Sequence, residues 1–488
     1  MIEIKSSLSS LLGEQCPFST PLCDRIFNHI CFDSRKVGKN DLMLVLPSVS
    51  GNEERYIEQA LNSGASLVVG AQEYHHDHYI QHKDAMALAA LVLNQVYKDP
   101  TNLLDVIGVT GTNGKSSVTF YVAQLLDALG KPSAVMGTLG YGHWDNLKET
   151  GMTTLPLPDL YQSMAELAAQ YQAVAMEVSS HGLDQNRLSG IKFHGAVFTN
   201  LSRDHLDYHG DMDHYFAAKQ KLFMWPELHF VVINGDDDYG QQLLQTAAKN
   251  NVLGLSYGRH PDNDLMFEIK SVLSNGAEVE FRYHGKSCAT TVELYGEFNI
   301  YNCAAAVAVA LASNYDFESV VNATASIKPV KGRMELVSTG RSDEPTVLVD
   351  YAHTPDAVTQ LLKAAKQHCK GKLITVVGCG GDRDRGKRPL MAQAAVDSSD
   401  HVIFTNDNPR TESPQQIVSD MVKGLKAQYQ IELDRKHAIE LAVQMASPSD
   451  VIVIAGKGHE EYQDIQNVKH SFSDQVTAYQ ALLSREQL

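Results

Sequence analysis

A glycine-rich turn that precedes a lysine and two hydroxyl side chains is the stretch of this sequence best suited to chemistry. The run is Gly111, Thr112, Asn113, Gly114, Lys115, Ser116 and Ser117. In a phosphate-binding loop, backbone N–H groups at a helix N-terminus surround the phosphate oxygens, the lysine contacts the terminal phosphates and the hydroxyl reaches Mg²⁺. One position departs from the strict pattern, because Val109 stands where its first glycine is expected. The alternative is an ordinary glycine-rich turn with a surface lysine.

Three further side chains could serve the same chemistry, although two of them have an ordinary explanation when read alone. Glu177 ends a strand-like run, and its carboxylate together with the Ser116 hydroxyl would suit Mg²⁺, which prefers hard oxygen ligands. His205 follows another strand-like run, where a hydrogen-bonded histidine without a metal is the ordinary interpretation. Lys219 lies on a stretch with helical periodicity, where a solvated lysine is the default.

These residues depend on regular elements to bring them together. The apolar run Val106–Val109 predicts a buried strand before the glycine turn, and helical periodicity follows the turn to about Leu129. Strand-like and helical runs alternate across the central part of the chain. This alternation favours a mostly parallel sheet with ligands at the carboxyl ends of its strands. The strand candidates there are Val106–Thr110, Ala173–Val178, Gly195–Asn200 and Phe230–Asn234.

The same alternation occurs before and after this central part, and a chain of 488 residues is too long for one core. We therefore predict an α/β protein with three domains. They are a small α/β domain at 1–88, a central P-loop mononucleotide-binding domain with a parallel sheet at 89–331, and a C-terminal Rossmann-like α/β domain at 332–488. The outer strand candidates are Leu42–Leu46, Ser66–Gly70, Val347–Asp350, Leu373–Val377, Val402–Thr405 and Val451–Ala455. Helices are expected over Glu54–Ser63, Asp84–Tyr97 and Tyr215–Phe223.

Composition excludes several classes of partner. The net charge of −17 argues against nucleic-acid binding, and no apolar run is long enough for membrane insertion. The N-terminus lacks the features of a signal peptide, and the seven cysteines form no regular framework, so we expect a cytoplasmic protein without a structural zinc site. The glycines at 378–381 lack dinucleotide spacing, which argues against a nicotinamide cofactor.

Five strings in this order resemble the ATP-dependent Mur ligases, and the likeness covers essentially the whole chain. The strings are Gly111–Ser116, Glu177–Gly182, Thr199–Gly210, Gly332–Glu335 and Asp350–Pro355. Asp407, Asn408, Pro409 and Arg410 resemble the signature of the branch of this family that adds meso-2,6-diaminopimelate. The resemblance implies a ligase of peptidoglycan synthesis, and so of cell-wall biogenesis, cell shape and cell division.

The resemblance implies roles at the nucleotide. ATP would be held by the phosphate loop with Asn299, Asn302, Arg333 and Asp350. It also implies that Lys219 is carbamylated, since CO₂ would convert this cation into an anionic oxygen ligand. The implied Mg²⁺ ligands are Ser116, Glu177, His205 and carbamylated Lys219. Lys115, His205 and Lys219 would be the catalytic residues.

The resemblance also implies two substrate sites. UDP-MurNAc-L-Ala-D-Glu would be bound by Ser34, Thr153, Thr154, Ser179, Gln185 and Arg187. Diaminopimelate would be bound by Arg383, Asp407, Asn408, Pro409, Arg410, Gly456 and Glu460. Arginine suits its distal carboxylate because the guanidinium pairs bidentately, and Glu460 suits the distal ammonium. The resemblance further implies that ATP activates the D-glutamate γ-carboxylate as an acyl phosphate before the amine attacks, and a monomer is expected.

Three other functions are compatible with parts of the sequence. A folate polyglutamate ligase shares the ATP domain but would need neither a UDP-binding first domain nor Asp407–Arg410. A P-loop switch would hydrolyse ATP without joining substrates. A catalytically silent relative would act as a binding module, against which the intact Lys115, His205 and Lys219 argue.

Overall fold

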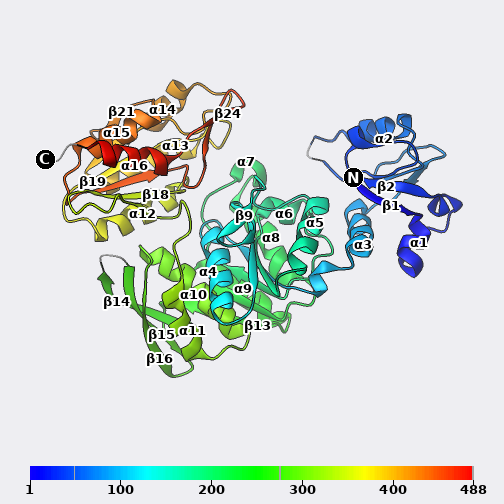
Figure 1. Cartoon of the computed structure of the whole chain (residues 1–488), viewed down its shortest axis with the longest axis horizontal. Coiled ribbons are helices and arrows are strands. Elements are labelled where there is room, and N and C mark those ends of the chain that lie inside the picture. The colour runs from blue at the N-terminus through cyan, green and yellow to red at the C-terminus, as the bar shows by residue number, and fades with distance from the viewer. Residues whose placement is uncertain (49, 274–275, 486–488) are drawn as a thin grey trace. The chain divides into compact units, whose positions relative to one another are not determined.

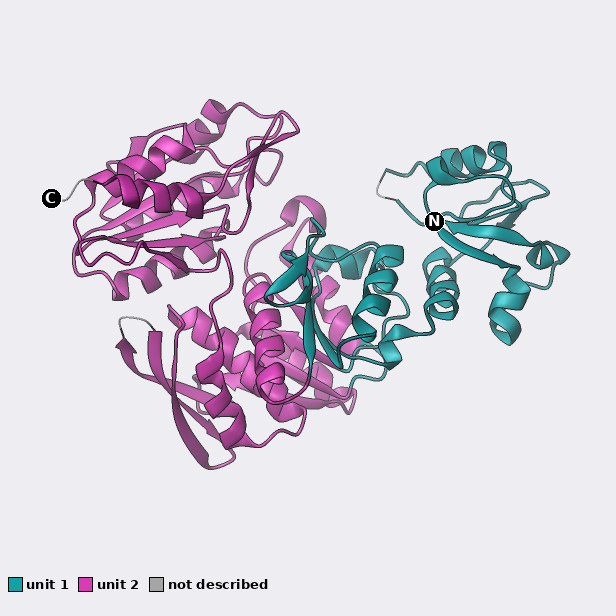
Figure 2. Cartoon of the chain, viewed as in Figure 1, with its two compact units in different colours: residues 1–107, 132–194, 225–228 teal, residues 108–131, 195–224, 229–488 magenta. Residues whose placement is uncertain are grey.

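The computed structural model describes residues 1–48, 50–273 and 276–485, and these form two compact units. Figure 2 distinguishes unit 1, with residues 1–107, 132–194 and 225–228, from unit 2, with residues 108–131, 195–224 and 229–488. Helices and strands alternate through both units, as the order of the elements in Figure 1 shows. The predicted α/β class is therefore confirmed. The predicted domain boundaries near residues 88 and 331 stay predictions.

Unit 1 begins with a five-stranded sheet of order β1-β2-β3-β4-β5. Its strands are β1 (Ile2–Ser6), β2 (Phe27–Cys31), β3 (Leu42–Leu44), β4 (Leu67–Gly70) and β5 (Tyr79–Gln81). Only β1 runs antiparallel to its neighbour. Helix α2 (Glu53–Asn62) buries Ile57 and Ala60 in the core of this sheet. The sequence predicted β3, β4 and α2, and it missed β1, β2 and β5.

The rest of unit 1 contains the strand that ends at Glu177. Strand β10 (Ala173–Glu177) lies parallel to β7 (Ser133–Gly137), and the antiparallel strands β8 (Gly140–His143) and β9 (Asn146–Lys148) follow. The helices of unit 1 are α1 (Leu8–Leu12), α2, α3 (Ala85–Tyr97), α5 (Leu157–Ala168) and α6 (Ser180–Asp184). Asp84 caps α3 by accepting a hydrogen bond from the backbone of Ala87, so the predicted helix there is confirmed.

Unit 2 carries the phosphate loop between β6 (Asp105–Thr110) and α4 (Lys115–Ala128), as the sequence predicts. Strands β11 (Gly195–Phe198), β12 (Phe230–Asn234), β13 (Leu253–Gly258) and β14 (Leu265–Leu273) are parallel neighbours. Beyond them, β15 (Gly276–Tyr283) and β16 (Lys286–Val292) continue the sheet in antiparallel pairing, which the sequence did not predict. Apart from Thr110, the buried residues of β6, β11 and β12 are apolar or glycine, which explains why these strands could be found by hydrophobicity.

The helices of this part of unit 2 surround the loop and its strands. Helix α10 packs against α4, and nearly all of its side chains are buried. The predicted helix over 215–223 begins earlier, because Asp211 caps α8 at His214, and it continues as a 3₁₀ turn over Lys221–Met224. The helices are α4, α7 (Leu206–His209), α8 (Met212–Gln220), α9 (Asp238–Lys249), α10 (Glu297–Ala312) and α11 (Phe317–Ala323).

The C-terminal part of unit 2 has its own six-stranded sheet of order β17-β18-β22-β19-β20-β21. All neighbours are parallel except the β17–β18 pair. The strands are β17 (Glu335–Val337), β18 (Thr346–Asp350), β19 (Leu373–Val377), β20 (His401–Phe404), β21 (Gln430–Ile431) and β22 (Val451–Ala455). The four predicted strands are thereby confirmed as β18, β19, β20 and β22.

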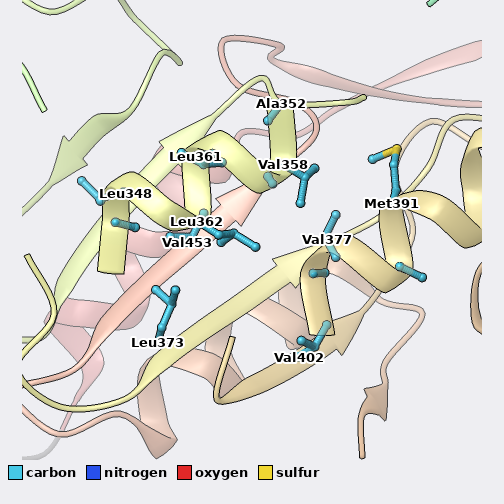
Figure 3. Close-up of a cluster of buried hydrophobic side chains, with 14 of the residues drawn as sticks. Leu348, Ala352, Val358, Leu361, Leu362, Leu373, Val377, Met391, Val402 and Val453 are labelled. Carbon is cyan, nitrogen blue, oxygen red and sulfur yellow. The ribbon is translucent and has the colours of Figure 1, made fainter. Parts of the chain in front are cut away.

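Helices cover both faces of this sheet, each over its own apolar cluster. Figure 3 shows one cluster, in which Leu361 and Leu362 of α12 lie near Leu348 and Val453 of the sheet. The helices are α12 (Pro355–Gln367), α13 (Lys387–Ser398), α14 (Pro414–Val422), α15 (Arg435–Met445) and α16 (Asp474–Ser484). A separate hairpin pairs β23 (Tyr462–Ile465) with β24 (Val468–Ser471).

No helix within the described residues combines the length and apolar character that crossing a bilayer requires.

Candidate active site

The phosphate loop has a conformation that only glycine tolerates at two positions. Gly114 has φ +85°, and a Cβ there would lie 2.5 Å from the Asn302 Oδ1 atom. Gly111 has φ +150°, and a Cβ there would lie 1.9 Å from the Thr199 Oγ1 atom. Both glycines therefore allow a close approach as well as a positive φ. Val109, the departure from the strict motif, is a fully buried residue of β6 and lies outside this turn.

The loop is fixed from the side by the segment after β11. The Thr112 N–H donates to the Asn200 carbonyl at 2.8 Å, and the Asn113 N–H donates to the Asn200 side chain at 3.0 Å. The Thr199 hydroxyl donates to the Asn113 carbonyl at 2.6 Å. These bonds constrain the conformation of the loop, which lowers the entropy cost of ligand binding.

Two lysine ammonium groups meet at one carbonyl of the loop. Lys115 Nζ donates to the Gly111 carbonyl at 2.9 Å and to the Thr112 carbonyl at 2.8 Å. Lys219 Nζ donates to the same Gly111 carbonyl at 2.8 Å. Lys219 is buried, and this burial together with the charge of Lys115 lowers the pKa of Lys219 well below its usual value. The sequence-based default of a solvated lysine is therefore wrong, because α8 faces its last turn inward.

Asp204 and His205 follow β11 and form a charged cluster with the C-terminal part of unit 2. His205 has φ +54°, and its Nε2 atom lies 3.3 Å from Asp204 Oδ2. The His353 Nε2 atom lies 3.9 Å from the same oxygen. Burial opposes ionisation of Asp204, but His353, His205 and Lys387 outweigh it and lower the pKa of Asp204 to about 2. The carboxyl group is therefore an anion near neutral pH.

Arg333 reaches the start of α4 from the C-terminal part of unit 2. Its Nη2 atom donates to the Ser116 hydroxyl at 3.0 Å, and its guanidinium stacks 4.4 Å from the centre of the Tyr351 ring. Asp350 instead accepts backbone N–H bonds from Met334 and Ala352, each at 2.7 Å. Burial raises the pKa of this carboxyl group. Asp350 thus fixes the backbone beside Arg333.

The two predicted asparagines of α10 form part of the wall beside the loop. Asn302 Nδ2 donates to Asn299 Oδ1 at 3.2 Å, and the Tyr121 hydroxyl donates to the same oxygen at 3.3 Å. Asn299 Nδ2 donates to the Tyr295 carbonyl at 3.0 Å. Since Asn302 also faces Gly114, the structure brings this predicted ATP residue to the loop.

Unit 1 gathers Glu177 and most of the residues predicted for the sugar-nucleotide substrate. Glu177 accepts from the Thr138 N–H at 2.9 Å, and the Thr138 hydroxyl lies 3.0 Å from that of Thr153. Thr154 donates its hydroxyl to the Glu177 carbonyl at 3.0 Å, and Arg187 donates to the Thr154 carbonyl at 2.9 Å.

Further hydrogen bonds extend this group. Ser179 caps α6 and donates its backbone N–H to the Thr154 hydroxyl at 3.0 Å, and Arg187 donates to the Gln185 side chain at 2.9 Å. Thr153, Thr154, Ser179, Gln185 and Arg187 are thus one contiguous polar group. Ser34 belongs instead to the first sheet of unit 1, where its hydroxyl donates to Gln59 Oε1 at 2.9 Å. The predicted joint role of Ser34 and this group stays a prediction.

The predicted amino-acid residues gather at the carboxyl ends of β20 and β22. Asn408 Nδ2 donates to Glu460 Oε2 at 2.7 Å. Gly456 has φ +118°, and a Cβ there would lie 2.4 Å from Asp407 Oδ2, so only glycine permits this approach. Arg410 has φ +51°, and its Nη1 atom donates to the Gly381 carbonyl at 2.7 Å.

The loop that contains Arg383 packs against this group, although the Arg383 side chain itself is exposed. The Gly381 N–H donates to the Asn408 carbonyl at 2.9 Å, and a Cβ on Gly381 would lie 1.9 Å from the Pro409 carbonyl oxygen. Arg383 Nη1 donates to the Asp382 carbonyl at 3.0 Å. The structure thus brings the Arg383 loop to the site and leaves the guanidinium facing solvent.

Sequence reasoning missed the residues that support this second site. The Arg410 N–H donates to the Asp464 carbonyl at 2.9 Å, and the Gln466 N–H donates to the Arg410 carbonyl at 2.8 Å. The β23–β24 hairpin therefore holds Arg410 in its left-handed conformation. Lys457 Nζ donates to Asn408 Oδ1 at 3.0 Å and to Glu460 Oε2 at 2.9 Å. The only available signal for Lys457 was its place between two glycines.

Two of the four predicted metal ligands offer donor atoms that suit Mg²⁺, whereas the His205 imidazole nitrogen is a less usual ligand for this ion. Ser116 offers a hydroxyl and Glu177 a carboxylate, both hard oxygen donors, whereas the Lys219 amine would need conversion to a carbamate. Ser116, His205 and Lys219 belong to unit 2, and Glu177 belongs to unit 1. Their joint coordination of Mg²⁺ stays a prediction. Among the described residues, no group of three or more histidine, cysteine, aspartate or glutamate residues is arranged to hold a metal ion.

The sequence matches two protein-family models. Residues 109–310 match the Mur ligase middle domain, and residues 332–458 match the model described as "Mur ligase, glutamate ligase domain". The first match contains the phosphate loop and the second contains Arg333 and Asp407–Arg410. The two family models together therefore include the phosphate loop and the proposed amino-acid site of unit 2.

Curated relatives are similar over almost their whole length. A UDP-N-acetylmuramoyl-L-alanyl-D-glutamate--2,6-diaminopimelate ligase from Neisseria meningitidis is 42% identical over 468 residues, which cover 93% of this chain and 94% of the relative. An enzyme of the same name from Coxiella burnetii is 41% identical over 463 residues, covering 92% of this chain and 94% of the relative. These matches confirm the family resemblance inferred from the five strings.

Solved structures agree with these sequence matches. A structure of a ligase with the same name superposes with a TM-score of 0.72 at 36% identity and covers 99% of both chains. A MurF from Acinetobacter baumannii gives a TM-score of 0.61 at 18% identity, covering 93% of this chain and 96% of that one. A folylpolyglutamate synthase from Mycobacterium tuberculosis gives 0.61 at 19% identity, covering 82% of this chain and 95% of that one. The last two show a shared fold only.

Proposed function

Because this chain belongs to the Mur ligase family, we propose that it is the ligase that joins meso-2,6-diaminopimelate to UDP-N-acetylmuramoyl-L-alanyl-D-glutamate. The new amide forms at the D-glutamate γ-carboxylate, and ATP is consumed. The observation that carries this assignment is the identity of 41–42% to relatives with that activity in their names, over 92–93% of this chain. Asp407–Arg410 with Glu460 supports the choice of amino acid.

The reaction needs ATP because a carboxylate is a poor electrophile. Transfer of the γ-phosphoryl group to the γ-carboxylate oxygen gives an acyl phosphate and ADP. Attack by the diaminopimelate amine on the acyl carbon then forms the C–N bond, and phosphate leaves with the former carboxylate oxygen. The amine loses one proton in this step.

Residues of the phosphate loop supply positioning and charge. Two anions, the carboxylate and the γ-phosphate, must approach each other, and Lys115 would offset their repulsion. The backbone N–H groups at the start of α4 face the phosphate position, as in other helix N-terminal anion sites. Arg333, already hydrogen-bonded to Ser116, brings a second positive charge to the same place.

Mg²⁺, held by Ser116, Glu177, His205 and carbamylated Lys219, would neutralise phosphate charge during transfer. Lys219 is suited to carbamylation because its buried amine is easily neutralised, and only the neutral amine attacks CO₂. The carbamate forms as the amine bonds to the CO₂ carbon and releases one proton.

Both remaining substrates have candidate sites of fitting chemistry. The polar group around Thr154 and Arg187 would bind the peptide end of the UDP-linked substrate, and Ser34 would belong to the uridine site. Arg410 would pair with the distal carboxylate of diaminopimelate and Glu460 with its distal ammonium. We expect the enzyme to act as a monomer in the cytoplasm, and its seven cysteines are all free thiols, which fits a reducing compartment.

The deciding experiment supplies ATP, Mg²⁺ and the UDP-muramoyl-dipeptide with either diaminopimelate or lysine. Mass spectrometry of the product should detect one added diaminopimelate and little or no lysine adduct. Phosphate release without any amino acid would instead support a P-loop switch. Glutamate addition to a folate substrate would support the folate ligase alternative.

A further inference from the structure

A fully buried lysine lies under the proposed amino-acid site, and none of the roles described so far uses it. Lys457 follows β22, and its side chain has 0% exposure. Its ammonium bonds to Asn408 at 3.0 Å and to Glu460 at 2.9 Å, and it lies 5.5 Å from the centre of the Tyr462 ring. A buried ammonium is costly unless it is paired, and these contacts with Asn408 and Glu460 supply that pairing.

The two glycines beside Lys457 direct it inward. Gly456 approaches Asp407 too closely for a side chain, and Gly458 has φ +52° with the Gly332 carbonyl 2.7 Å from where a Cβ would lie. The Gly458 carbonyl also accepts a hydrogen bond from Gln475 at 2.9 Å. The backbone is therefore packed on both sides of Lys457, and the lysine side chain has a fixed position.

Lys457 and the Asp464 backbone together determine how the Asn408 amide is oriented. The Asn408 Oδ1 atom accepts from Lys457 Nζ and from the Asp464 N–H at 2.9 Å, so the Nδ2 atom must face Glu460. Glu460 Oε2 then has two donors, from Lys457 and Asn408. Within the described part of the chain, the other oxygen of Glu460 has no hydrogen-bond partner and stays available to a ligand.

Lys457 also sets the charge of the site. Its positive charge cancels that of Glu460. The Asp464 carboxylate lies 3.9 Å from Arg410, so the two carboxylates of Asp407 and Asp464 balance the two arginines, Arg383 and Arg410, and the site has no net charge. The nearby buried Arg435 is balanced by Asp474 at 2.7 Å. Diaminopimelate has two carboxylates and two ammonium groups and no net charge, whereas lysine lacks the second carboxylate and has a net charge of plus one. A neutral site suits diaminopimelate, and a site made net negative by loss of Lys457 would favour lysine.

Resting on the proposed function, we infer that Lys457 is a positioning residue that fixes Asn408 and Glu460 and makes the site select diaminopimelate over lysine. It acts through these two residues and touches no substrate itself. Without Lys457, Glu460 would be an unbalanced anion, and the net negative site would attract the positively charged lysine more strongly than diaminopimelate, which has no net charge.

The test compares Lys457→Met with the wild type, using diaminopimelate and lysine as competing substrates. We expect the KM for diaminopimelate to rise about 10- to 100-fold, as expected when a charged hydrogen-bonding partner is lost. The KM values for ATP and the UDP-linked substrate should stay the same. The ratio of kcat/KM for diaminopimelate to that for lysine should fall by about tenfold or more.

Two further variants separate charge from general damage. Lys457→Gln keeps a hydrogen-bond donor and removes the charge, so it should lose discrimination against lysine. Lys457→Met combined with Glu460→Gln removes both charges and should regain that discrimination. The double variant has no unbalanced buried carboxylate. If the single variants fail to fold, the test compares this double variant with the wild type. Lys469→Met is the matched control, because Lys469 lies 4.1 Å from the centre of the same Tyr462 ring but is exposed.

The outcomes separate this inference from the function on which it rests. A wild type that adds no diaminopimelate overturns the proposed function. A wild type that adds diaminopimelate, together with Lys457 variants that keep the wild-type preference, overturns only the role of Lys457. A double variant that discriminates no better than Lys457→Met also overturns it.

Discussion

The phosphate loop and the proposed amino-acid site, both in unit 2, are built in different ways. The phosphate loop is one continuous run, Gly111–Ser117, between a buried strand and a helix. The amino-acid site combines Asp407–Arg410 with Glu460 and depends on Lys457 and on the hairpin at Asp464. The first site is therefore specified mainly by neighbours in sequence, and the second by contacts between distant segments.

This difference has a consequence for what each site contributes. The phosphate loop uses backbone N–H groups and one lysine, and its chemistry is the same for any triphosphate. The proposed amino-acid site is built from side chains that other side chains hold in place, which would allow it to distinguish similar ligands. Changes at the first site should affect turnover with every amino acid, and changes at the second should affect the choice among them.

The largest expected effect comes from Lys115→Ala. Loss of this ammonium leaves the phosphate repulsion uncompensated, and kcat/KM should fall by about 1,000-fold or more with every amino acid. Product formation followed by mass spectrometry measures this. Lys249→Ala, at an exposed position in the last turn of α9, is the control and should be indistinguishable from the wild type. Near-normal turnover by Lys115→Ala would contradict the proposed role of the phosphate loop and so remove its contrast with the amino-acid site.

The second prediction concerns CO₂ and Lys219. Removal of dissolved CO₂ should lower turnover by about 100-fold, since it removes a proposed metal ligand, and bicarbonate should restore it. A carbamate carbon should appear in the ¹³C spectrum after addition of labelled bicarbonate. Lys219→Ala should be inactive at all CO₂ levels. Wild-type activity that does not depend on CO₂ would show that Lys219 is unmodified.

The third prediction tests the amino-acid site through Arg410→Ala. Loss of the charged hydrogen bonds to the distal carboxylate should raise the KM for diaminopimelate about 10- to 100-fold. The KM for ATP should not change. Arg410→Ala should thus affect only the binding of diaminopimelate, whereas Lys115→Ala should lower turnover with every amino acid. Arg282→Ala, on the exposed surface of β15, serves as the control. An equal rise in both KM values would mean that the two sites do not act separately.

The smallest expected effect is on stability and concerns His459, which lies beside Glu460. Burial, with the charges of Arg333, Lys331 and Lys457, lowers the pKa of His459 to about 3. The unfolded chain therefore binds a proton at pH 5 that the folded chain does not, and acid favours unfolding. This residue should cost about 2 kcal/mol of unfolding free energy between pH 7 and pH 5.

Denaturant titrations at the two pH values measure this effect. The centres of the His459 and Tyr351 rings lie 5.2 Å apart, and His459→Phe keeps an aromatic ring at this position. This variant should lose less unfolding free energy between pH 7 and pH 5 than the wild type. His470→Phe, at an exposed position of β24, should leave it unchanged. Equal pH dependence in all three proteins would mean that His459 is protonated in the folded state.

Much of the fold was readable from sequence because its central strands are buried on both faces. The run Val451–Ala455 is entirely apolar and Leu373–Val377 is apolar except for Thr375, and each was predicted within a residue of its bounds. The antiparallel strands β14 to β16 were missed because their exposed faces interrupt the apolar pattern. The short strands β21 and β23 carry too few buried residues to be recognised.

The candidate sites divide in the same way. The phosphate loop was found from its glycines, lysine and serines, while the burial of Lys219 was not, because it depends on α8 packing toward Gly111. The positive φ of Arg410 has no signal in the sequence, since arginine rarely adopts this conformation without support. Lys457 was passed over because a lysine between glycines usually lies in an exposed turn.

The two backbone hydrogen bonds between Arg410 and the β23–β24 hairpin have a consequence for transplanting selectivity between related ligases. If Asp407–Arg410 alone were transferred to a related ligase, Arg410 would lack the hairpin whose backbone hydrogen bonds hold it in the left-handed conformation. Asp407–Arg410 and the β23–β24 hairpin should therefore be exchanged together. A chimaera that receives both segments should also acquire the amino-acid preference.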